Sequence, residues 1–351
     1  MGAGREAVLL VGGQGTRLRP LTLTTPKPLL PVAGVPFLTH QLAALRRADI
    51  EHVVLATSYR PEIFTETFGD GSALGLTITY LTEEEPLGTG GAIRHAAEGL
   101  VGAADEPIVV LNGDVLSGHD IAGQVAFHVS VDADVTLHLV EVEDARPYGC
   151  VPSDADGRVT GFLEKMDHPV TRWVNAGAYV FRRSVIDEIP EGRVVSVERE
   201  TFPGLLSAGR DVRAWRESAY WCDVGTPEAL VQCSADIVLG RAPTAAEMHL
   251  PGEAWFADAH RPPADAVIKG GSSVGAGAHI GSSAVVDGSV IMAGAVIEAG
   301  ATVVRSVIGR EAHVGARASL NGAVLADRAR IAPGAVLIDG ERVDADERAA
   351  Q

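Results

Sequence analysis

The sequence predicts an α/β domain with a mostly parallel sheet, followed by a short left-handed parallel β-helix of hexapeptide repeats. Two observations carry this prediction. In the first two thirds of the chain, short apolar strands alternate with amphipathic helices, the order that places parallel strands side by side. In the last third, apolar residues recur with a period of 17, which is typical of stacked coils.

Size and charge narrow the classes of function. The chain has 351 residues, which is long for one hydrophobic core, so we expect two domains. Its formal net charge of −17 argues against nucleic acid or an anionic membrane as a partner, because both need a basic surface. A phosphate site must then be a local basic cluster.

Cysteine content and hydropathy predict a cytoplasmic protein. Cys150, Cys222 and Cys233 fit no metal-site spacing and no even disulfide framework, which suits a reducing compartment. The apolar run near the N-terminus is too short for a signal peptide, and no stretch is long enough to span a bilayer.

The elements of the α/β domain follow from apolar periodicity and from turn residues. We expect strands at 7–11, 52–57, 76–81 and 108–111, and helices at 36–49, 61–68, from the loop at 83–91 to about 100, and 227–239. Ligands of such sheets bind beyond the carboxyl ends of the strands. The residues directly after strands are therefore the first candidates for a site.

The loop after the first strand has the composition of a polyanion site. Gly12, Gly13 and Gly15 let backbone N–H groups approach phosphate oxygens, since no Cβ stands in the way. Arg17 offers a planar fork for bidentate contact, and Lys27, between two prolines, offers a mobile point charge. The spacing fits neither the P-loop nor the dinucleotide-binding glycine motif.

Two further loops hold candidate ligands. The segment 83–91 opens a helix, whose free N–H groups can meet a base edge or a phosphate, although a flexible acidic loop is the alternative. Asp114 and Asp223 each follow an apolar strand, and two such carboxylates can share one Mg²⁺. For Asp114 alone, an Asx turn explains the residue as well.

A hairpin is predicted around the turn at 154–157, and it brings Gly149 near Glu164. Glu164 can accept from two sugar hydroxyls and Lys165 can contact a phosphate, while a surface ion pair is the alternative. Asn175 interrupts the apolar strand that follows, where the backbone approaches another group closely.

Several motifs resemble the signature of the sugar-1-phosphate nucleotidylyltransferases. They are GGQGTRLRPLT at 12–22, PKP at 26–28, PLGTGG at 86–91, NGD at 112–114 and WCDVGTP at 221–227. SVERETFP at 196–203 resembles the mannose-1-phosphate guanylyltransferase branch, although Ser196 also makes a good helix cap. The resemblance implies a Rossmann-like mixed sheet that transfers a nucleoside monophosphate from an NTP, GTP first, to a sugar 1-phosphate and releases pyrophosphate.

The resemblance also implies roles for single residues. The nucleotide would be bound by Gly12, Gly13, Gly15, Thr16, Arg17, Glu84, Gly88 and Thr89. The sugar phosphate would be bound by Asn112, Gly149, Glu164, Lys165 and Asn175, and Mg²⁺ by Asp114 and Asp223. Arg17, Lys27 and Lys165 would be catalytic. The usual EKP motif is replaced here by a longer loop after Lys165, which leaves the shape of the sugar pocket open.

The β-helix is read from apolar positions spaced six, six and five residues apart. They are Val274, Ile280, Val286, Ile291, Ile297, Val303, Ile308, Val314, Leu320, Leu325, Ile331 and Leu337. We expect a catalytic domain at 1–239, a connector at 240–263, the β-helix at 264–340 and a tail at 341–351. The β-helix is expected to pack against the first domain and to help form a homo-oligomer.

Other functions remain open at this stage. The two substrates can differ from GTP and mannose 1-phosphate: the donor can be ATP, UTP or dTTP, and the acceptor can be glucose 1-phosphate or a cyclitol 1-phosphate. The chain can be a non-catalytic regulatory subunit, although the basic and acidic motif residues are intact. An acyltransferase would use His279 or His313 of the β-helix, but a histidine without an oriented partner is weak support for a general base.

Overall fold

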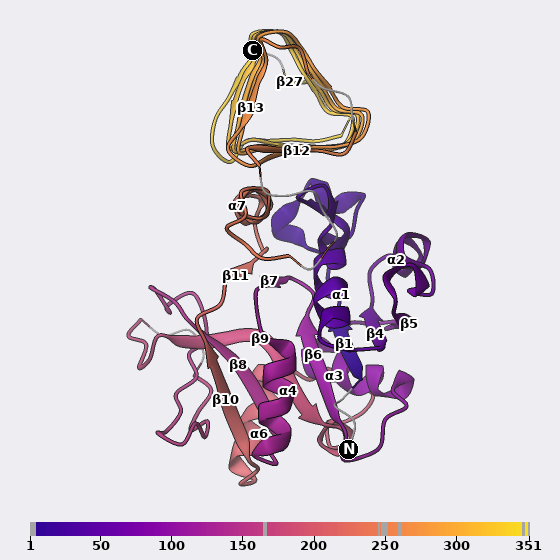
Figure 1. Cartoon of the computed structure of the whole chain (residues 1–351), viewed down its shortest axis with the longest axis vertical. Helices are drawn as coiled ribbons and strands as arrows, with labels where there is room; N and C mark the ends of the chain where they lie inside the picture. The colour runs from indigo at the N-terminus through magenta and orange to yellow at the C-terminus, as the bar shows by residue number, and fades with distance from the viewer. Residues whose placement is uncertain are drawn as a thin grey trace. The chain divides into compact units, whose positions relative to one another are not determined.

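The computed structural model describes residues 5–163, 167–244, 246, 252–258, 262–345 and 348–349. The chain forms two compact units, one of residues 1–13 with 41–221 and one of residues 14–40 with 222–351. The first unit carries a large sheet and the second carries the β-helix (Figure 1). The loop predicted to bind phosphate therefore belongs mostly to the unit that contains the β-helix.

A seven-stranded mixed sheet forms the core of the first unit, in the order β10-β8-β9-β6-β1-β4-β5. Neighbouring strands are parallel except around β9, which is antiparallel to β6 and to β8. The strands are β1 (Glu6–Leu10), β4 (His52–Thr57), β5 (Thr77–Thr82), β6 (Pro107–Asn112), β8 (Val135–Glu141), β9 (Trp173–Arg182) and β10 (Val212–Glu217). The predicted mixed, mostly parallel sheet is confirmed.

The helices agree with the periodicity of the sequence. They are α1 (Phe37–Arg47), α2 (Pro61–Phe68), α3 (Gly88–Ala96), α4 (Ile121–Ser130), α5 (Arg183–Asp187), α6 (Phe202–Ser207) and α7 (Pro227–Val238). Helix α2 and strand β4 have the predicted bounds, and the other predicted elements differ by a few residues at their ends. Ser196 caps the helical turn before α6, because its hydroxyl accepts from the Arg199 N–H.

The β-helix consists of three parallel sheets that form the sides of a triangle (Figure 1). One sheet holds β12 (Ala254–Phe256), β14 (Ser272–Val274), β17 (Val290–Ile291), β20 (Val307–Ile308), β23 (Val324–Leu325) and β26 (Arg342–Val343). The next holds β13 (Val267–Lys269), β16 (Val285–Asp287), β19 (Thr302–Val304), β22 (Ser319–Asn321) and β25 (Val336–Leu337). The third holds β15 (His279–Ile280), β18 (Val296–Ile297), β21 (His313–Val314), β24 (Arg330–Ile331) and β27 (Arg348–Ala349).

All twelve predicted inward side chains of the β-helix are buried, and Val286, Ile297 and Val303 are fully so. Most pairs join residues 17 apart, as predicted from the sequence; Val290 with Val307 is an example. The pairs at both ends are 18 apart, such as Trp255 with Ser273. Because the added residue breaks the 17-residue period, the sequence pattern missed the outermost strands. Strand β12 lies within the stretch 240–263 that was expected to be a connector, and β26 follows residue 340, where the β-helix was expected to end.

The expectation of no disulfide framework is wrong, because the structure pairs Cys222 with Cys233. The turn after Cys222 is closed by Thr226, whose hydroxyl accepts from the Ala229 N–H and caps α7. This folds α7 back, so the two Cα atoms lie 6.8 Å apart although 11 positions separate them in the sequence. Cys150 is buried and has no disulfide partner.

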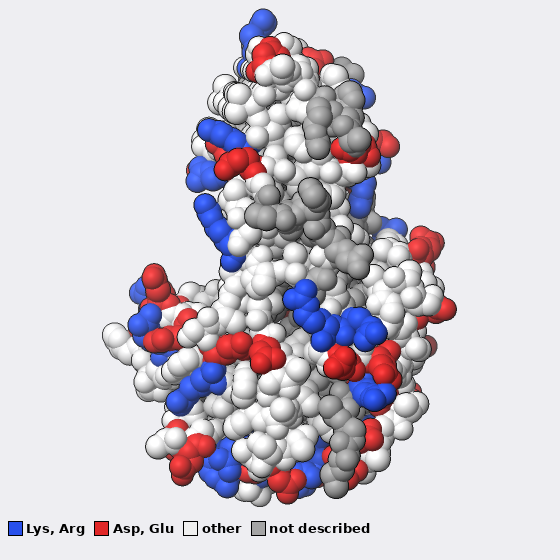
Figure 2. Space-filling model, in the orientation of Figure 1, with Lys and Arg blue, Asp and Glu red and all other residues white. Residues whose placement is uncertain are grey.

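Among the described residues, no helix is long and apolar enough to cross a membrane. On the face shown in Figure 2, basic and acidic side chains are interspersed, and neither sign forms one broad patch. On this face the acidic side chains are therefore spread among basic ones rather than gathered in one place.

Candidate active site

Three loops follow β1, β4 and β6 at one edge of the sheet, because these strands are parallel and in register. The packing there is close: a Cβ on Gly12 would lie 2.8 Å from the Ser58 Oγ. The Ser58 hydroxyl accepts a hydrogen bond from the Gly13 N–H, at 3.3 Å. The first glycines of the motif thus lie at the carboxyl edge, where α/β sheets bind ligands.

The turn after β6 carries Asp114 at the same edge. The Gly113 N–H donates to the Leu10 carbonyl oxygen at 2.9 Å. A Cβ on Gly113 would lie 2.5 Å from that oxygen, so only glycine fits. This contact fixes the backbone directly before the Asp114 carboxylate against the end of β1.

Gln41 of α1 holds the same turn from a second direction. Its Nε2 donates to the carbonyl oxygens of Asn112 and Val115, at 2.8 and 3.0 Å. These two carbonyls flank Gly113 and Asp114, so one buried amide bridges the turn. Sequence reasoning missed Gln41; the available signal was a polar residue among the leucines of the apolar face of α1.

Asn175 and Asn112 lie in one polar cluster around Tyr179. Asn175 donates to the Tyr179 hydroxyl at 2.8 Å and accepts from the Gly177 N–H at 3.2 Å. Burial raises the pKa of Tyr179 well above 10, and the negative charge of Glu198 raises it further. Within the described residues, the buried Oδ1 of Asn112 has no hydrogen-bond partner, so it can accept from a bound ligand.

The glycine-rich loop that opens α3 is fixed against the backbone near Val195. The Gly90 N–H donates to the Val195 carbonyl oxygen at 2.8 Å, and the Val195 N–H donates to the Leu87 carbonyl oxygen at 2.8 Å. Gly88 has a φ of +71°, and a Cβ there would lie 2.6 Å from the Val195 carbonyl oxygen. Glycine is therefore required at the start of this helix.

The side chain of Thr89 is bonded within the protein. Its hydroxyl donates to Glu198 Oε2 at 2.8 Å and accepts from the Val197 N–H at 2.9 Å. The segment 196–203, which resembled a family motif in the sequence, thus forms hydrogen bonds to the predicted nucleotide loop through the side chain of Thr89. Any contact of Thr89 with a nucleotide is left to its backbone.

Glu83 shapes the start of this loop, and sequence reasoning chose its neighbour Glu84 instead. Glu83 is buried and its carboxylate accepts from the Leu87 N–H at 3.1 Å. Burial raises the pKa of Glu83, and the bond from Leu87 opposes this rise. Glu84 is exposed to solvent. Nothing in the local pattern separates the two acids, because only the tertiary fold decides which one faces inward.

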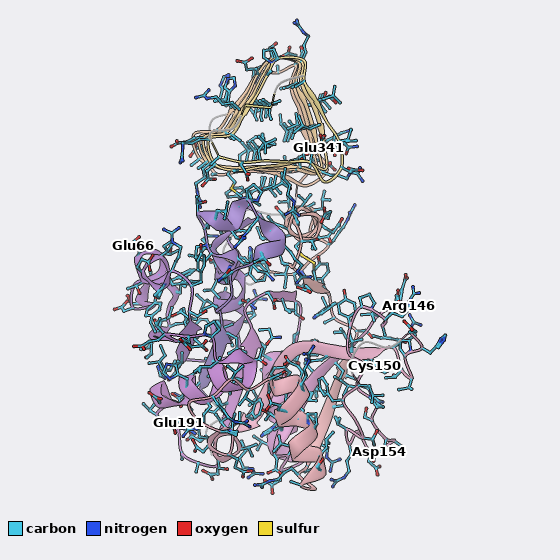
Figure 3. The ribbon with its side chains drawn as sticks, turned by 180° about the vertical axis from the view of Figure 1, so that it is seen from behind. Glu66, Arg146, Cys150, Asp154, Glu191 and Glu341 are labelled. Carbon is cyan, nitrogen blue, oxygen red and sulfur yellow. A yellow bond between two sulfur atoms is a disulfide. The ribbon has the colours of Figure 1, made fainter. Side chains whose placement is uncertain are left out.

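The predicted hairpin is confirmed over its described part. Cys150 and Leu163 exchange two backbone hydrogen bonds, and the turn at 154–157 closes with a bond from the Gly157 N–H to the Asp154 carbonyl oxygen. Figure 3 labels Cys150 in this hairpin and Asp154 at its exposed turn. Gly149 is half-buried beside Cys150, whereas Glu164 and Lys165 lie outside the described residues.

The second unit contains the phosphate loop, which we define as residues 14–28. Gly15 adopts a φ of +57°, and its carbonyl oxygen accepts from the Thr22 hydroxyl at 2.9 Å. A Cβ on Gly15 would lie 3.0 Å from Thr22 Cγ2 and 3.1 Å from Lys27 Cβ. The loop thus folds back on itself, which brings the stem of Lys27 to the glycine. Thr16 is exposed and starts the short helical turn that follows.

Arg17 and Asp223 meet at Gly225. A Cβ on Gly225 would lie 2.6 Å from Arg17 Nη2 and 3.1 Å from Asp223 Oδ1. The absence of a side chain at Gly225 therefore lets the guanidinium of Arg17 approach the turn that carries Asp223. The motif that contains Arg17 and the motif that contains Asp223 are about 200 positions apart in the sequence, but they lie next to each other in this unit.

The structure distributes the predicted site residues over the two units. The first unit holds Gly12, Gly13, Glu84, Gly88, Thr89, Asn112, Asp114, Gly149 and Asn175. The second holds Gly15, Thr16, Arg17, Lys27 and Asp223. Each unit offers backbone N–H groups at glycines and one candidate carboxylate ligand, and the described cations Arg17 and Lys27 both belong to the second.

One partly buried cluster, which follows the Asp114 turn in the sequence, was not predicted. His119 Nδ1 lies 2.7 Å from Glu217 Oε2, and His119 Nε2 lies 2.7 Å from Gln124 Oε1. The ring of His138 stacks on His119 at 3.9 Å, and burial above all lowers the pKa of His138 to about 3. The ring planes differ by only 13°, so their lone pairs do not converge on one ion. The cluster ties the start of α4 to β10.

Comparison with known families identifies the class. Residues 6–238 match the family described as nucleotidyl transferase, and residues 261–345 match the one described as the GMPPB C-terminal domain. The first match covers more than half of the chain, so the chain belongs to the nucleotidyl transferase family. It is an enzyme of the nucleotidyltransferase class. Members of this family generally use a divalent metal ion.

Similar proteins come from several kingdoms. A mannose-1-phosphate guanylyltransferase of Mycobacterium tuberculosis is 54% identical over 271 residues, which is 77% of this chain and 75% of the relative. A probable mannose-1-phosphate guanylyltransferase 3 of Oryza sativa is 42% identical over 63% of this chain and 62% of its own length. The catalytic subunit beta of the Drosophila melanogaster enzyme is 40% identical, over 65% and 61%. The chain thus spans less than two thirds of the rice and fly relatives.

Solved structures share the fold of about two thirds of the chain. HddC from Yersinia pseudotuberculosis is 28% identical with a TM-score of 0.57, covering 66% of this chain and 99% of HddC. The same protein has also been solved in complex with GMP-PN, with the same scores. A putative glucose-1-phosphate thymidylyltransferase from Bacillus anthracis, at 24% identity and a TM-score of 0.60, supports the fold alone.

Proposed function

We propose that this chain transfers GMP from GTP to mannose 1-phosphate, giving GDP-mannose and pyrophosphate. The observation that carries the proposal is the 54% identity to a mannose-1-phosphate guanylyltransferase over 77% of the chain. The GMP-PN complex of a structural neighbour supports a guanine nucleotide as the donor. Another nucleotide and sugar phosphate would use the same chemistry, and only the pair would change.

The reaction needs no covalent intermediate. An oxygen of the sugar 1-phosphate forms a bond to the α-phosphorus of the nucleotide, and the bond from that phosphorus to the bridging oxygen breaks. Pyrophosphate leaves in line with the attack. Because the attacking phosphate is already an anion, the protein does not have to remove a proton. Catalysis then consists of positioning and of stabilising negative charge.

Arg17 and Lys27 suit the stabilisation of the nucleotide phosphates. Arg17 holds the leaving β- and γ-phosphates with its planar fork, and Lys27 neutralises charge at the α-phosphate. Lys165 steers the phosphate of the acceptor. The orphan acceptor Oδ1 of Asn112 supports a contact with a hydroxyl of the sugar, since a buried acceptor without a partner is costly.

Asp114 and Asp223 suit Mg²⁺, which prefers oxygen ligands and takes one or two carboxylates together with phosphates. Asp114 follows β6 after Gly113, and Asp223 is the last residue of β11 (Trp221–Asp223), two positions before Gly225; both glycines are tightly packed, which makes each a rigid place for a ligand. When bound, the ion would neutralise charge that develops on the phosphates. The two aspartates would hold it.

We also propose a cytoplasmic location and a homo-oligomer. The oligomer is supported by exposed apolar side chains of the β-helix at Val336 and Ile338. Light scattering during size-exclusion chromatography measures the mass of the assembly and tests the oligomer directly.

Pyrophosphate release by the purified chain tests the reaction. The assay combines four nucleoside triphosphates with mannose 1-phosphate or glucose 1-phosphate in the presence of Mg²⁺. We expect release with GTP and mannose 1-phosphate far above that with any other pair. Release with another pair would keep the mechanism and change the substrates, whereas no release with any pair would reject catalysis and favour a regulatory subunit.

Two variants test the assigned roles. Asp223→Asn keeps the shape but removes the charge that binds the ion, and Lys27→Ala removes the cation at the α-phosphate. Each should lower kcat by about 10²-fold or more, the size seen when one charge-stabilising group is lost, with the thermal midpoint unchanged. Near-normal turnover in either variant would remove that residue from the mechanism.

A further inference from the structure

The phosphate loop is hydrogen-bonded to the β-helix within the second unit. Three side chains from three successive turns of the β-helix take part. The contacts are Arg310 Nη1 to Thr25 Oγ1 at 2.7 Å, Thr24 Oγ1 to Asp327 Oδ2 at 3.0 Å, and Arg342 Nη1 to the Arg19 carbonyl oxygen at 2.5 Å. Arg310 and Asp327 each lie two residues after a strand, β20 and β23, and Arg342 is the first residue of β26; we call the three residues together the corner column.

Two members of the corner column, Arg310 and Asp327, also contact each other. Arg310 and Asp327 are 17 positions apart, so they occupy the same place in neighbouring turns. The Arg310 N–H donates to Asp327 Oδ1 at 2.8 Å, and an Arg310 nitrogen lies 3.9 Å from Asp327 Oδ2. The Asp327 carboxylate thus uses one oxygen for the β-helix and the other for Thr24 of the loop. Its side chain is only 13% exposed, so solvent competes little for these bonds.

The loop is also held where it ends. The short hairpin β2 (Pro31–Val32) and β3 (Val35–Pro36) turns at Gly34, where a Cβ would overlap the Trp255 ring of β12. The Ala33 N–H donates to Ser234 Oγ at 2.9 Å, and that oxygen lies 3.3 Å from Ser273 Oγ of β14. The first turn of the β-helix therefore fixes the end of the loop, and the corner column fixes its middle.

The loop needs such support because little regular structure holds it. Residues 14–28 contain only helical turns of three residues, and Gly15 lowers their stiffness. Ordering one residue costs about 1–2 kcal/mol of conformational entropy. If contacts within the folded protein already order the loop, the binding of a nucleotide does not lose free energy to this ordering.

We propose that the β-helix is part of the nucleotide site: the corner column holds the phosphate loop in its binding conformation, so that Arg310, Asp327 and Arg342 are positioning residues for the triphosphate. This inference rests on the proposed function. It gives the β-helix a role beyond packing and assembly, and it places that role on the nucleotide and not on the sugar phosphate, because Arg17 and Lys27 are in this loop.

Steady-state kinetics of Arg310→Met and Arg342→Met in the full chain test the proposal. Each variant should raise KM for GTP about tenfold, the effect of losing roughly one charged hydrogen bond. KM for mannose 1-phosphate and kcat at saturating GTP should stay within twofold. Arg330→Met is the matched control, because Arg330 is exposed on β24 of another face, and its kinetic constants should match the wild type.

A double variant separates a specific contact from a general loss of fold. Thr25→Val removes the other end of the Arg310 contact, so Thr25→Val with Arg310→Met should raise KM for GTP no more than the larger single effect. Additive effects, or an equal rise of KM for both substrates, would overturn the proposal. So would an unchanged KM for GTP in both arginine variants.

Hydrogen exchange tests the same contact without activity. Peptides that cover residues 14–25 should exchange at least threefold faster in Arg310→Met and Arg342→Met than in the wild type or in Arg330→Met, while peptides of α3 stay the same. If the wild type releases no pyrophosphate with any nucleotide, the proposed function fails, and exchange still decides whether the corner column orders the loop. Equal exchange in all four proteins would refute that ordering.

Discussion

Replacing Gln41 by Met tests whether one buried amide positions the Asp114 turn. Methionine has a similar volume and length, so the change removes hydrogen bonds without opening a cavity. The lost bonds run from Gln41 Nε2 to the carbonyl oxygens of Asn112 and Val115, at 2.8 and 3.0 Å. The backbone on both sides of Asp114 then loses its bridge to α1.

The size of the effect follows from these contacts. Each lost hydrogen bond is worth about 1 kcal/mol, and both carbonyls are partly buried, so leaving them without a donor adds to the loss. In the described part of the chain, the Oε1 of Gln41 is buried without a hydrogen-bond partner, which destabilises the folded protein. Its removal in the variant therefore offsets part of the stability lost with the two hydrogen bonds. We expect the free energy of unfolding to fall by about 2 kcal/mol.

The effect on catalysis should exceed what this loss of stability explains. A ligand carboxylate displaced by about 1 Å can cost on the order of 10²-fold in rate. We therefore expect kcat to fall 10- to 100-fold under conditions where the variant is more than 95% folded, as determined by urea unfolding followed by circular dichroism. The apparent affinity for Mg²⁺, from a titration of activity, should fall as well.

Two results would refute this reasoning. Normal turnover with reduced stability would show that Gln41 supports only the fold, and unchanged stability would show that the two hydrogen bonds contribute nothing. Gln232→Met serves as the control, because Gln232 is exposed on α7 and donates to Asp236 of the same helix. It should leave both stability and turnover unchanged.

Three further predictions concern packing, pH and metal. Gly34→Ala should destabilise the chain by about 2 kcal/mol or more in urea unfolding, because its φ is +86° and the new Cβ overlaps the Trp255 ring; a loss below 0.5 kcal/mol would contradict this. Burial is the main cause that lowers the pKa of His138 to about 3 and the pKa of His128 to about 4. Both histidines therefore stay neutral in the folded protein, whereas in the unfolded chain each of them binds a proton below about pH 6.5. Stability should therefore fall from pH 6.5 to 4 by about 1.4 kcal/mol per pH unit for each histidine, and His138→Phe should reduce that slope; an unchanged slope would be inconsistent with this assignment. Chelation by EDTA should abolish pyrophosphate release and Mg²⁺ should restore it; persistent release would exclude a required metal.

The sequence by itself determined the architecture, because backbone hydrogen bonding and burial impose periods that can be read along the chain. The 17-residue period specified the inward side chains of the β-helix, and every one of the twelve is buried. The alternation of strands and helices specified the sheet, the glycines and charges after the first strand indicated a polyanion site, and the resemblance of the motifs to a known family implied the class of reaction. These signals are local, so no tertiary contact was needed to read them.

Tertiary structure alone decided which side chains meet. It turned Glu83 inward instead of Glu84, paired Cys222 with Cys233, and brought the buried amide of Gln41 to the Asp114 turn. It also joined the phosphate loop to the β-helix over about 300 positions of sequence. Such contacts depend on how elements pack in space, and the free energy that selects them leaves no period or spacing in the sequence.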